Sequence, residues 1–491
     1  MSGRQDGWLR VEADEPKATI ERLGSSNAEF QRRLSPRYER LKPGPGKSAE
    51  QVHASQRDRI HRAMVELTAE KGFNRVTVRA LTGMAGVSSR TFYMHFADRE
   101  QCLASTVDAI GRRILSRATL RKPDDATWKG RVSASLQSLL DDFATQPWAT
   151  RVLLVEVLGA GLPGRRQATE LTADLERLLA HLLVAAPMAS VPPRRLVIGI
   201  AAGLVRIATT TSLTGRTGEL PRLIGPLRDW VFDVYGNEAL HLCAIPERRS
   251  ADARRREPCL LPSAASALGG HGESERTLSA ALRLAARDGP GALTVSNIRR
   301  EAGVSRHDFD VRFGDANECL LAAIDSLART GAQRAYAWSA ATGGSQRRLD
   351  RTIFALCVLA ARNQTQAKLV LAQILVPGRA GLLRREMLVS DAASGLARVS
   401  PAALSPIDLA VEASVAAGWR ILQEEITAGQ AHRLPRVAPL LAYLISRPAN
   451  RDRKHRIQKV DCSAFSVGTS SARTPSATKQ RNQGEKPNDF T

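Results

Sequence analysis

The stretch Thr77-Val-Arg-Ala-Leu-Thr-Gly-Met-Ala-Gly-Val-Ser-Ser-Arg-Thr-Phe-Tyr-Met-His-Phe96 decides the fold, because it predicts two short helices joined by a tight turn. Thr77 is a preferred N-cap residue, and apolar residues follow it near helical spacing. Gly86 tolerates a positive φ and can reverse the chain, and Ser88 can cap the next helix directly after the turn. The stretch therefore predicts a helix-turn-helix motif.

The second predicted helix has an apolar side and a polar side. Phe92 and Phe96 lie one turn apart and can anchor the helix to a core. The other side chains carry hydroxyl, guanidinium and imidazole groups, which suit phosphate oxygens and base edges. They are Ser89, Arg90, Thr91, Tyr93 and His95. The motif alone leaves open an ordinary helical hairpin with a solvated polar face.

The stretch resembles the DNA-binding region of the TetR family of transcriptional regulators. The resemblance rests on Ala85-Gly-Val-Ser88, Thr91-Phe-Tyr-Met-His-Phe96 and Asp98-Arg-Glu100. It implies that Thr77, Thr91, Tyr93 and His95 hold the DNA backbone, that Ser89, Arg90 and Met94 meet bases, and that Ser88 belongs to the same interface. Arg99 stands where many family members have a phosphate-contacting lysine. Polar capping of the three-helix core is the alternative role for Tyr93 and His95.

The same pattern recurs later in the chain. Glu275 to Leu327 aligns with Asp58 to Ile110 at a constant offset of 217 residues and without a gap. Ala302-Gly-Val-Ser305 repeats the turn, and Phe309 and Phe313 repeat the two phenylalanines. We therefore predict an all-α protein with two TetR-like units fused in tandem, each a three-helix head followed by a helical body.

The second head departs from the family pattern at the positions that would face DNA. Asp308, Asp310 and Arg312 replace Thr91, Tyr93 and His95. The two carboxylates repel the DNA phosphates, and the remaining predicted contacts compensate this repulsion only in part. These contacts are Thr294, Arg306, His307 and Arg312. We therefore expect the first head to supply most of the DNA affinity, with the second a weaker or differently specific reader.

Composition agrees with a multidomain helical chain that binds a polyanion. At 491 residues the chain exceeds a single core, and aromatic residues make up 4% of it. The formal net charge of +22 favours association with nucleic acid, although part of the excess belongs to the predicted tails.

We predict seven segments along the chain. They are a disordered polar and basic extension (1–54), the first head (55–110), the first regulatory body (111–242), a flexible arginine-rich linker (243–272), the divergent second head (273–327), the second body (328–446) and a disordered basic tail (447–491).

The bodies are expected to regulate and to dimerise, by resemblance to the family. A small-molecule effector in an apolar cavity would move the fourth helix, and Phe143, Trp148, Leu154 and Leu158 are candidate lining residues. Ordinary core packing is the alternative role for these four side chains. Two segments rich in small residues, Arg194 to Leu213 and Ile407 to Ala428, can pack as an intramolecular pseudo-dimer, with a homodimer of the whole chain as the alternative.

Other classes of protein fit the sequence poorly. The six cysteines are scattered without metal-ligand spacing, which favours a reduced, cytoplasmic chain that holds no metal or other cofactor. The most hydrophobic run, Leu196 to Val205, is well short of the ~20 residues that span a bilayer, so no membrane is expected. The histidines form no ligand cluster and no nucleophile elbow occurs, so we expect no enzyme.

The sequence thus predicts a sequence-specific transcriptional regulator that binds double-stranded DNA, a repressor by family analogy, with control by a small molecule. The alternative is a non-catalytic DNA-associated or interaction protein that binds largely non-specifically through basic segments, without effector control.

Overall fold

The computed structural model describes residues 48–121, 123, 127–184, 192–235, 272–340, 345–399 and 409–446. Every regular element in these ranges is an α-helix or a short 3-10 helix, which confirms the all-helical prediction. The predicted extension up to residue 47, the linker up to residue 271 and the tail from residue 447 lie outside the described residues.

The first head is a three-helix unit that continues into a long fourth helix. Its elements are α3 (Ala49–Lys71), η1 (Phe73–Arg75), α4 (Val78–Ala85), α5 (Ser89–His95) and α6 (Arg99–Leu120). Each of the three helices contributes a fully buried side chain to one core. These side chains are Ile60, Leu81 and Phe92. Phe92 and Phe96 therefore anchor α5, as the sequence predicts.

Helix α3 begins earlier than the sequence pattern indicates. The predicted first head begins at residue 55, whereas α3 starts at Ala49. Ser48 accepts a hydrogen bond from Gln51 N, and the Gln51 side chain accepts one from Ser48 N. This capping box satisfies backbone donors that would otherwise lack partners, so residues 49–54 are helical and not part of a disordered extension.

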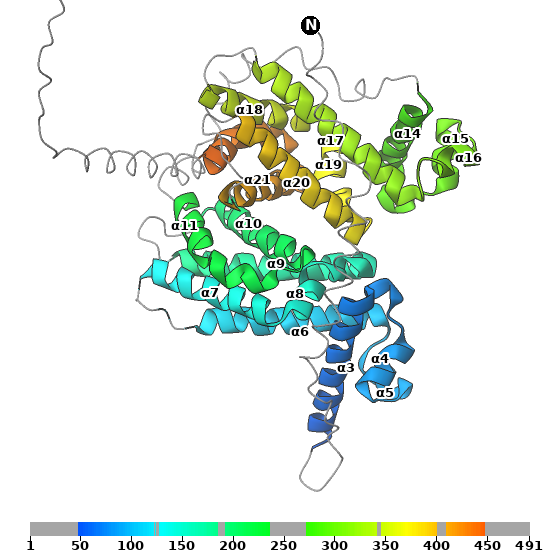
Figure 1. Cartoon of the computed structure of the whole chain (residues 1–491), viewed down its shortest axis with the longest axis vertical. Helices are drawn as coiled ribbons and strands as arrows, with labels where there is room; N and C mark the ends of the chain where they lie inside the picture. The colour runs from blue at the N-terminus through cyan, green and yellow to red at the C-terminus, as the bar shows by residue number, and fades with distance from the viewer. Residues whose placement is uncertain are drawn as a thin grey trace, which may run out of the picture. The chain divides into compact units, whose positions relative to one another are not determined.

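The first body surrounds a central apolar helix, α10. Its elements are α7 (Trp128–Thr145), α8 (Pro147–Leu154), η2 (Glu156–Ala160), α9 (Gly161–Val184), α10 (Arg194–Leu213), η3 (Thr217–Leu223) and α11 (Ile224–Val234). Figure 1 shows these helices in cyan to green. Leu196, Ile198 and Ile200 of α10 are all buried, on more than one side of the helix.

The second half of the chain begins with the same order of elements as the first. Its elements are α14 (Glu273–Asp288), η6 (Pro290–Ala292), α15 (Val295–Ala302), α16 (Arg306–Asp310), α17 (Ala316–Ala340), α18 (Ser345–Arg362), α19 (Gln364–Leu371), η7 (Gln373–Leu375), α20 (Arg379–Val399), α21 (Leu409–Thr427), η8 (Ala431–Arg433) and a last helix over residues 434–446. We call α14 to α16 the second head and the helices from α17 onward the second body. Gly303 in its turn has φ 66° and ψ 39°, against φ 61° and ψ 40° for Gly86.

Helices α10 and α21 pack closely along each other, because small residues line their contact (Figure 1). A Cβ atom at Gly199 would lie 3.3 Å from Ala417 Cβ, and one at Gly203 would lie 2.9 Å from Ala413 O. Trp230 Nε1 of α11 donates to Ser414 Oγ at 2.9 Å across the same contact. The two halves therefore share one apolar core.

Helix α10 is also long and apolar enough to cross a membrane by length and composition. Of its apolar window, 78% is buried inside the protein. Packing against α21, α9 and α8 accounts for its apolar character, since the core helix of a folded domain passes the same test.

We expect Gly203→Ala to destabilise the contact between α10 and α21. The added Cβ would lie 2.9 Å from Ala413 O of α21 and 2.3 Å from the Trp230 ring of α11, so these neighbours must shift, at a cost of about 1–3 kcal/mol. Thermal and urea unfolding of the full chain measure the change.

The matched control is Gly331→Ala in α17, where an added Cβ meets nothing within 4 Å. That substitution should stabilise the helix by about 0.5–1 kcal/mol. Equal effects of the two substitutions would contradict close packing at Gly203.

Candidate functional site

The turn of the first head presents the N-terminus of α5 to solvent. Thr77 Oγ1 accepts from Ala80 N at 3.2 Å at the start of α4. Ser88 Oγ accepts from Thr91 N at 3.0 Å and lies 2.9 Å from the Thr91 hydroxyl. Both caps are where the sequence predicts them, and they fix the direction of α5.

A buried arginine holds this turn in place. Arg59 of α3 donates from Nη1 to Ala85 O at 2.9 Å and to Gly86 O at 3.3 Å. These carbonyls at the end of α4 lack helical partners, so the guanidinium supplies their missing donors. Sequence reasoning missed Arg59, although its position beside the apolar stripe of α3 is the signal that a long side chain there turns inward.

The outer face of α5 exposes groups of several kinds in one small area. Tyr93 and Met94 are 58% and 61% exposed, while Phe92 between the helices is buried. Ser89 and Arg90 are exposed beside them. A solvent-facing cluster of an aromatic, a thioether, a hydroxyl and a guanidinium is typical of a binding surface, because large apolar side chains are seldom exposed together without a partner.

His95 lies at the edge of this face and belongs partly to the head's core. Its Nε2 lies 3.3 Å from Gln56 Oε1, and its ring meets His53 edge-on with centroids 5.6 Å apart. Burial lowers the pKa of His95, and the charges of Arg57 and His53 lower it further. At neutral pH the imidazole is therefore a hydrogen-bonding group and not a cation.

Arg99 lies at the start of α6, where it holds a loop of the head. It donates to Val76 O at 2.8 Å and to Glu100 Oε1 at 3.0 Å, and it stacks 4.9 Å from the centroid of Phe73. This arrangement gives Arg99 a structural role that the resemblance did not imply. Its predicted contact with DNA phosphate stays a prediction.

The second head neutralises most of its own cations. Arg306 Nε lies 3.3 Å from Asp310 Oδ2, and Arg312 donates to Glu273 at 3.0 Å. Ser305 Oγ donates to the Asp308 carboxylate, which lowers the pKa of Asp308 and keeps it charged. Thr294 caps α15 as Thr77 caps α4, and His307 is exposed. The scaffold of the first head thus recurs with a different surface charge.

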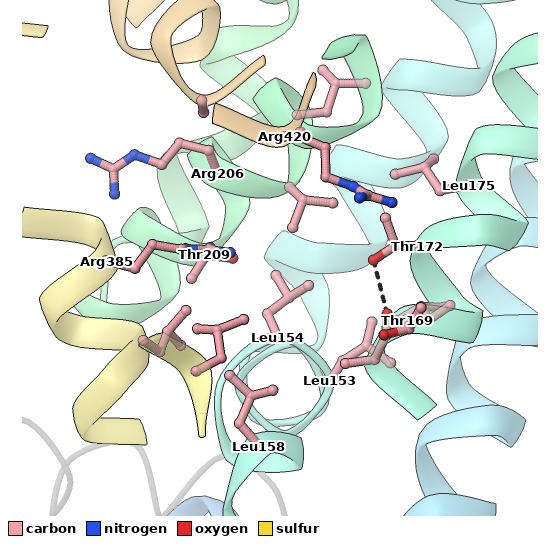
Figure 2. Close-up of a pocket in the computed structure, with 18 of the residues that line it drawn as sticks. Leu153, Leu154, Leu158, Thr169, Thr172, Leu175, Arg206, Thr209, Arg385 and Arg420 are labelled. Atoms are coloured by element: carbon pink, nitrogen blue, oxygen red, sulfur yellow. Dashed lines mark hydrogen bonds between the residues drawn. The ribbon is translucent and has the colours of Figure 1, made fainter. Parts of the chain in front are cut away.

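A cavity of about 450 Å³ lies between the first body and helices α20 and α21 (Figure 2). Three of the four predicted lining residues, Phe143, Leu154 and Leu158, do line it. Trp148, on α8, is not among the residues that line it.

Four arginines in the cavity wall escaped the sequence analysis. Arg165 and Arg206 come from the first body, and Arg385 and Arg420 come from α20 and α21. Burial lowers the pKa of Arg385 to about 10, and the charges of Arg206 and Arg420 lower it further. No local pattern marks these residues, since the fold brings them together from distant parts of the chain.

The 3-10 segment η2 connects this cavity with the first head. Leu158 of η2 lines the cavity, while a Cβ at the adjacent Gly159 would touch Phe73 of the head at 3.5 Å. The buried Glu156 of η2 lies 3.3 Å from Arg151 Nε and 3.4 Å from Arg379 Nη1 of the second body. A movement of η2 would therefore change its contacts with both the cavity and the first head.

Comparison with known proteins identifies the first head. Residues 60–106 match the family model described as "Bacterial regulatory proteins, tetR family". The first head is a TetR-type domain. This match supports a DNA-binding transcriptional regulator, and it covers the capped turn, α5 and the start of α6.

Several solved structures are similar to part of the chain. One is the fatty acid degradation regulator FadR of Bacillus halodurans, with 18% identity and a TM-score of 0.33 over 39% of this chain and 96% of that one. FadR of Bacillus subtilis in complex with stearoyl-CoA has 20% identity and a TM-score of 0.31 over 35% and 96% of the two chains. A TetR-like regulator from Rhodococcus sp. RHA1 has 15% identity and a TM-score of 0.30 over 36% and 94%.

The TetR-type head contains a partly buried histidine, His61. His61 Nε2 lies 3.2 Å from Ser105 Oγ, and its ring packs beside Phe96 with centroids 5.6 Å apart. Burial lowers the pKa of His61 to about 4, an effect that Asp58 and Asp108 oppose and that Arg57 and His95 reinforce.

We expect the head to lose stability as the pH falls from 6.5 towards 4. In that window the unfolded head takes up a proton at His61 that the folded head excludes, at a cost of up to about 3 kcal/mol. His61→Leu, which installs the residue found at Leu278 in the second head, should remove this part of the pH dependence. Hydrogen exchange of α3 amides in the full chain, corrected for intrinsic rates, measures it.

His181→Leu serves as the control, since His181 is exposed on α9. If the pH dependence of the head were the same in the wild type and in His61→Leu, the buried imidazole would not be its cause.

Proposed function

We propose that the chain is a sequence-specific transcriptional repressor in which the TetR-type head supplies most of the DNA affinity. The observation that supports this most directly is the exposed face of α5, with Arg90, Tyr93 and Met94 directed away from the core of a domain whose family regulates transcription. A helix presented in this way can enter the major groove, where its side chains reach base edges.

The second head, in this proposal, is a weaker reader on the same scaffold. Its turn has the backbone conformation of the first, but α16 is shorter than α5 and pairs Arg306 with Asp310. The exposed pair of Arg306 and Asp310 has no net charge and offers little attraction to phosphate. The preferred DNA site is then asymmetric.

We further propose that the two halves act as an intramolecular pseudo-dimer. The packing of α10 against α21, with Gly199 opposite Ala417, supports this arrangement. Ion pairs at one end of the same contact, the start of α10, join Arg194 to Glu424 at 2.5 Å and Arg195 to Glu425 at 2.7 Å. Covalent linkage then replaces the association of two separate subunits.

Control by a small molecule is the third part of the proposal. The cavity has the volume of a ligand site, and η2 touches the cavity wall and the TetR-type head at once. A ligand that binds one position of η2 better than another would shift the head. A DNA-associated protein that binds without sequence preference is the competing function, and it predicts equal affinity for all fragments with a steep dependence on salt.

The two heads should respond unequally to matched substitutions. Arg90→Ala should weaken binding to the preferred DNA fragment by about 1–3 kcal/mol, roughly 5- to 150-fold. Arg306→Ala should change it little, because that side chain is paired with Asp310. The double substitution Asp308→Thr with Asp310→Tyr should strengthen binding by about 10-fold at low salt, since it removes two negative charges.

Fluorescence anisotropy measures these affinities on the fragment that footprinting of the purified protein selects. Arg177→Ala removes one exposed, ion-paired charge far from α5 and is the control for net charge. Equal losses for Arg90→Ala and Arg306→Ala would contradict the unequal roles, and binding of every fragment alike would favour the competing function.

A pseudo-dimer predicts that the purified chain is a single species of 53.2 kDa. Gel filtration with light scattering measures the mass over a range of protein concentrations. Twice that mass at every concentration would favour a dimer of whole chains. The DNA complex should contain one chain, with the heads on half-sites about one helical turn apart, ~34–36 Å.

A further inference from the structure

The cavity has an apolar wall and a cationic wall, and both halves of the chain contribute to each: Arg165 and Arg206 come from the first body, and Leu375, Leu382 and Val389 come from the second. The first body supplies mainly leucines from α7, α8, α9 and η2, of which Leu153, Leu154 and Leu158 are labelled in Figure 2. The second body supplies Arg385 and Arg420, and Figure 2 shows both side chains directed towards the space between the walls. A ligand that fills the cavity must satisfy an apolar wall and a cationic one.

The cavity lining contains more arginines than glutamates. It has Arg165, Arg206, Arg385 and Arg420 against Glu386 and Glu424, while Glu412 and Glu176 pair with Arg206 and Arg420 from outside the lining. Glu386 is shared by Arg206 and Arg385, and an anion in the cavity would add to the neutralisation of these closely grouped cations.

Arg385 is the group that an anion would stabilise most. Its only carboxylate partner in the described ion pairs, Glu386, is also bound by Arg206. Arg385 lines the cavity, and 22% of its side chain is accessible. Arg420 approaches from α21, where Nη1 lies 3.0 Å from Glu424 and Nη2 lies 3.3 Å from Glu176.

We propose that this cavity binds an amphipathic organic anion, a monocarboxylate whose apolar body lies against the leucines and whose carboxylate is held by Arg385 and Arg420. The proposal rests on the ligand control proposed above and adds the chemical class of the ligand. Arginine suits this role because its planar guanidinium binds a carboxylate with two parallel hydrogen bonds.

The site spans both halves and exists in one orientation. At the offset of 217 residues, Ala168 and Gly203 stand where Arg385 and Arg420 stand in the second half. The first half therefore lacks these two cations, so the same pair of helices cannot form an equivalent site with the halves exchanged. One ligand per chain follows from this asymmetry.

The volume limits the size of the ligand. A cavity of about 450 Å³ lies in the lower part of the range for small-molecule sites, about 300–1,000 Å³. An unbranched carboxylate of roughly ten carbons matches a cavity of this size better than a much longer chain.

The test uses the full chain without DNA and the probes hexanoate, decanoate and hexadecanoate. Isothermal titration should give one decanoate per chain, and decanoate should raise the Tm. Decanol and decylammonium, which have the same chain, should bind at least about 10-fold more weakly, because they lack the charge-assisted hydrogen bonds to arginine.

Two substitutions test the two walls separately. Arg420→Gln should weaken decanoate binding by about 10-fold or more and leave decanol unchanged. Leu154→Trp should block both, because the larger ring occupies the cavity while the arginines remain. Arg216→Gln, a fully exposed residue with its own partner Glu219, should bind decanoate as the wild type does. Circular dichroism confirms that each variant is folded.

The proposal is overturned if none of the three carboxylates binds, if decanol binds as tightly as decanoate, or if both wall variants bind normally. The affinity of the same protein for the selected DNA fragment is measured without ligand, so that the proposed regulator function and the proposed ligand class are tested separately. Normal DNA binding without carboxylate binding rejects the ligand class alone, whereas carboxylate binding without any DNA preference rejects the regulator.

Discussion

The close approach of α10 to α21 is the constraint on which the rest of the described structure depends. Gly199 and Gly203 have no side chain to hold the helices apart, so backbone meets backbone and the two halves bury a common core. The same approach brings Arg206 into contact with Glu386 and within 3.5 Å of Glu412. It also encloses the cavity, which residues of both halves line.

Much of the TetR-type head could be predicted from the sequence because its determinants are local. Thr77, Gly86 and Ser88 act on neighbours within a few residues, and their caps and turn are found where the sequence places them. The bounds of α10 follow from its composition in the same way. Helix α3 starts earlier than predicted because the capping box of Ser48 and Gln51 stabilises its first turn, in a polar stretch without apolar periodicity.

The cavity wall was predictable only in its apolar part. Helical periodicity indicates that Leu154 and Leu158 are buried, but it does not identify the residues that they contact. Arg206 and Glu386 are 180 residues apart in sequence, so no spacing rule pairs them. The role of Arg59 was not predicted for a related reason. Its partners are backbone carbonyl groups of another helix, and every residue has such a group, so no sequence pattern identifies them.

A two-fold symmetric dimer receives every substitution twice, once on each side of its axis. In the contact between α10 and α21 each side chain occurs once, so a change on one helix is not imposed on the other. Because both heads belong to one chain, a substitution in α5 leaves α16 unchanged, and the two helices carry different charges.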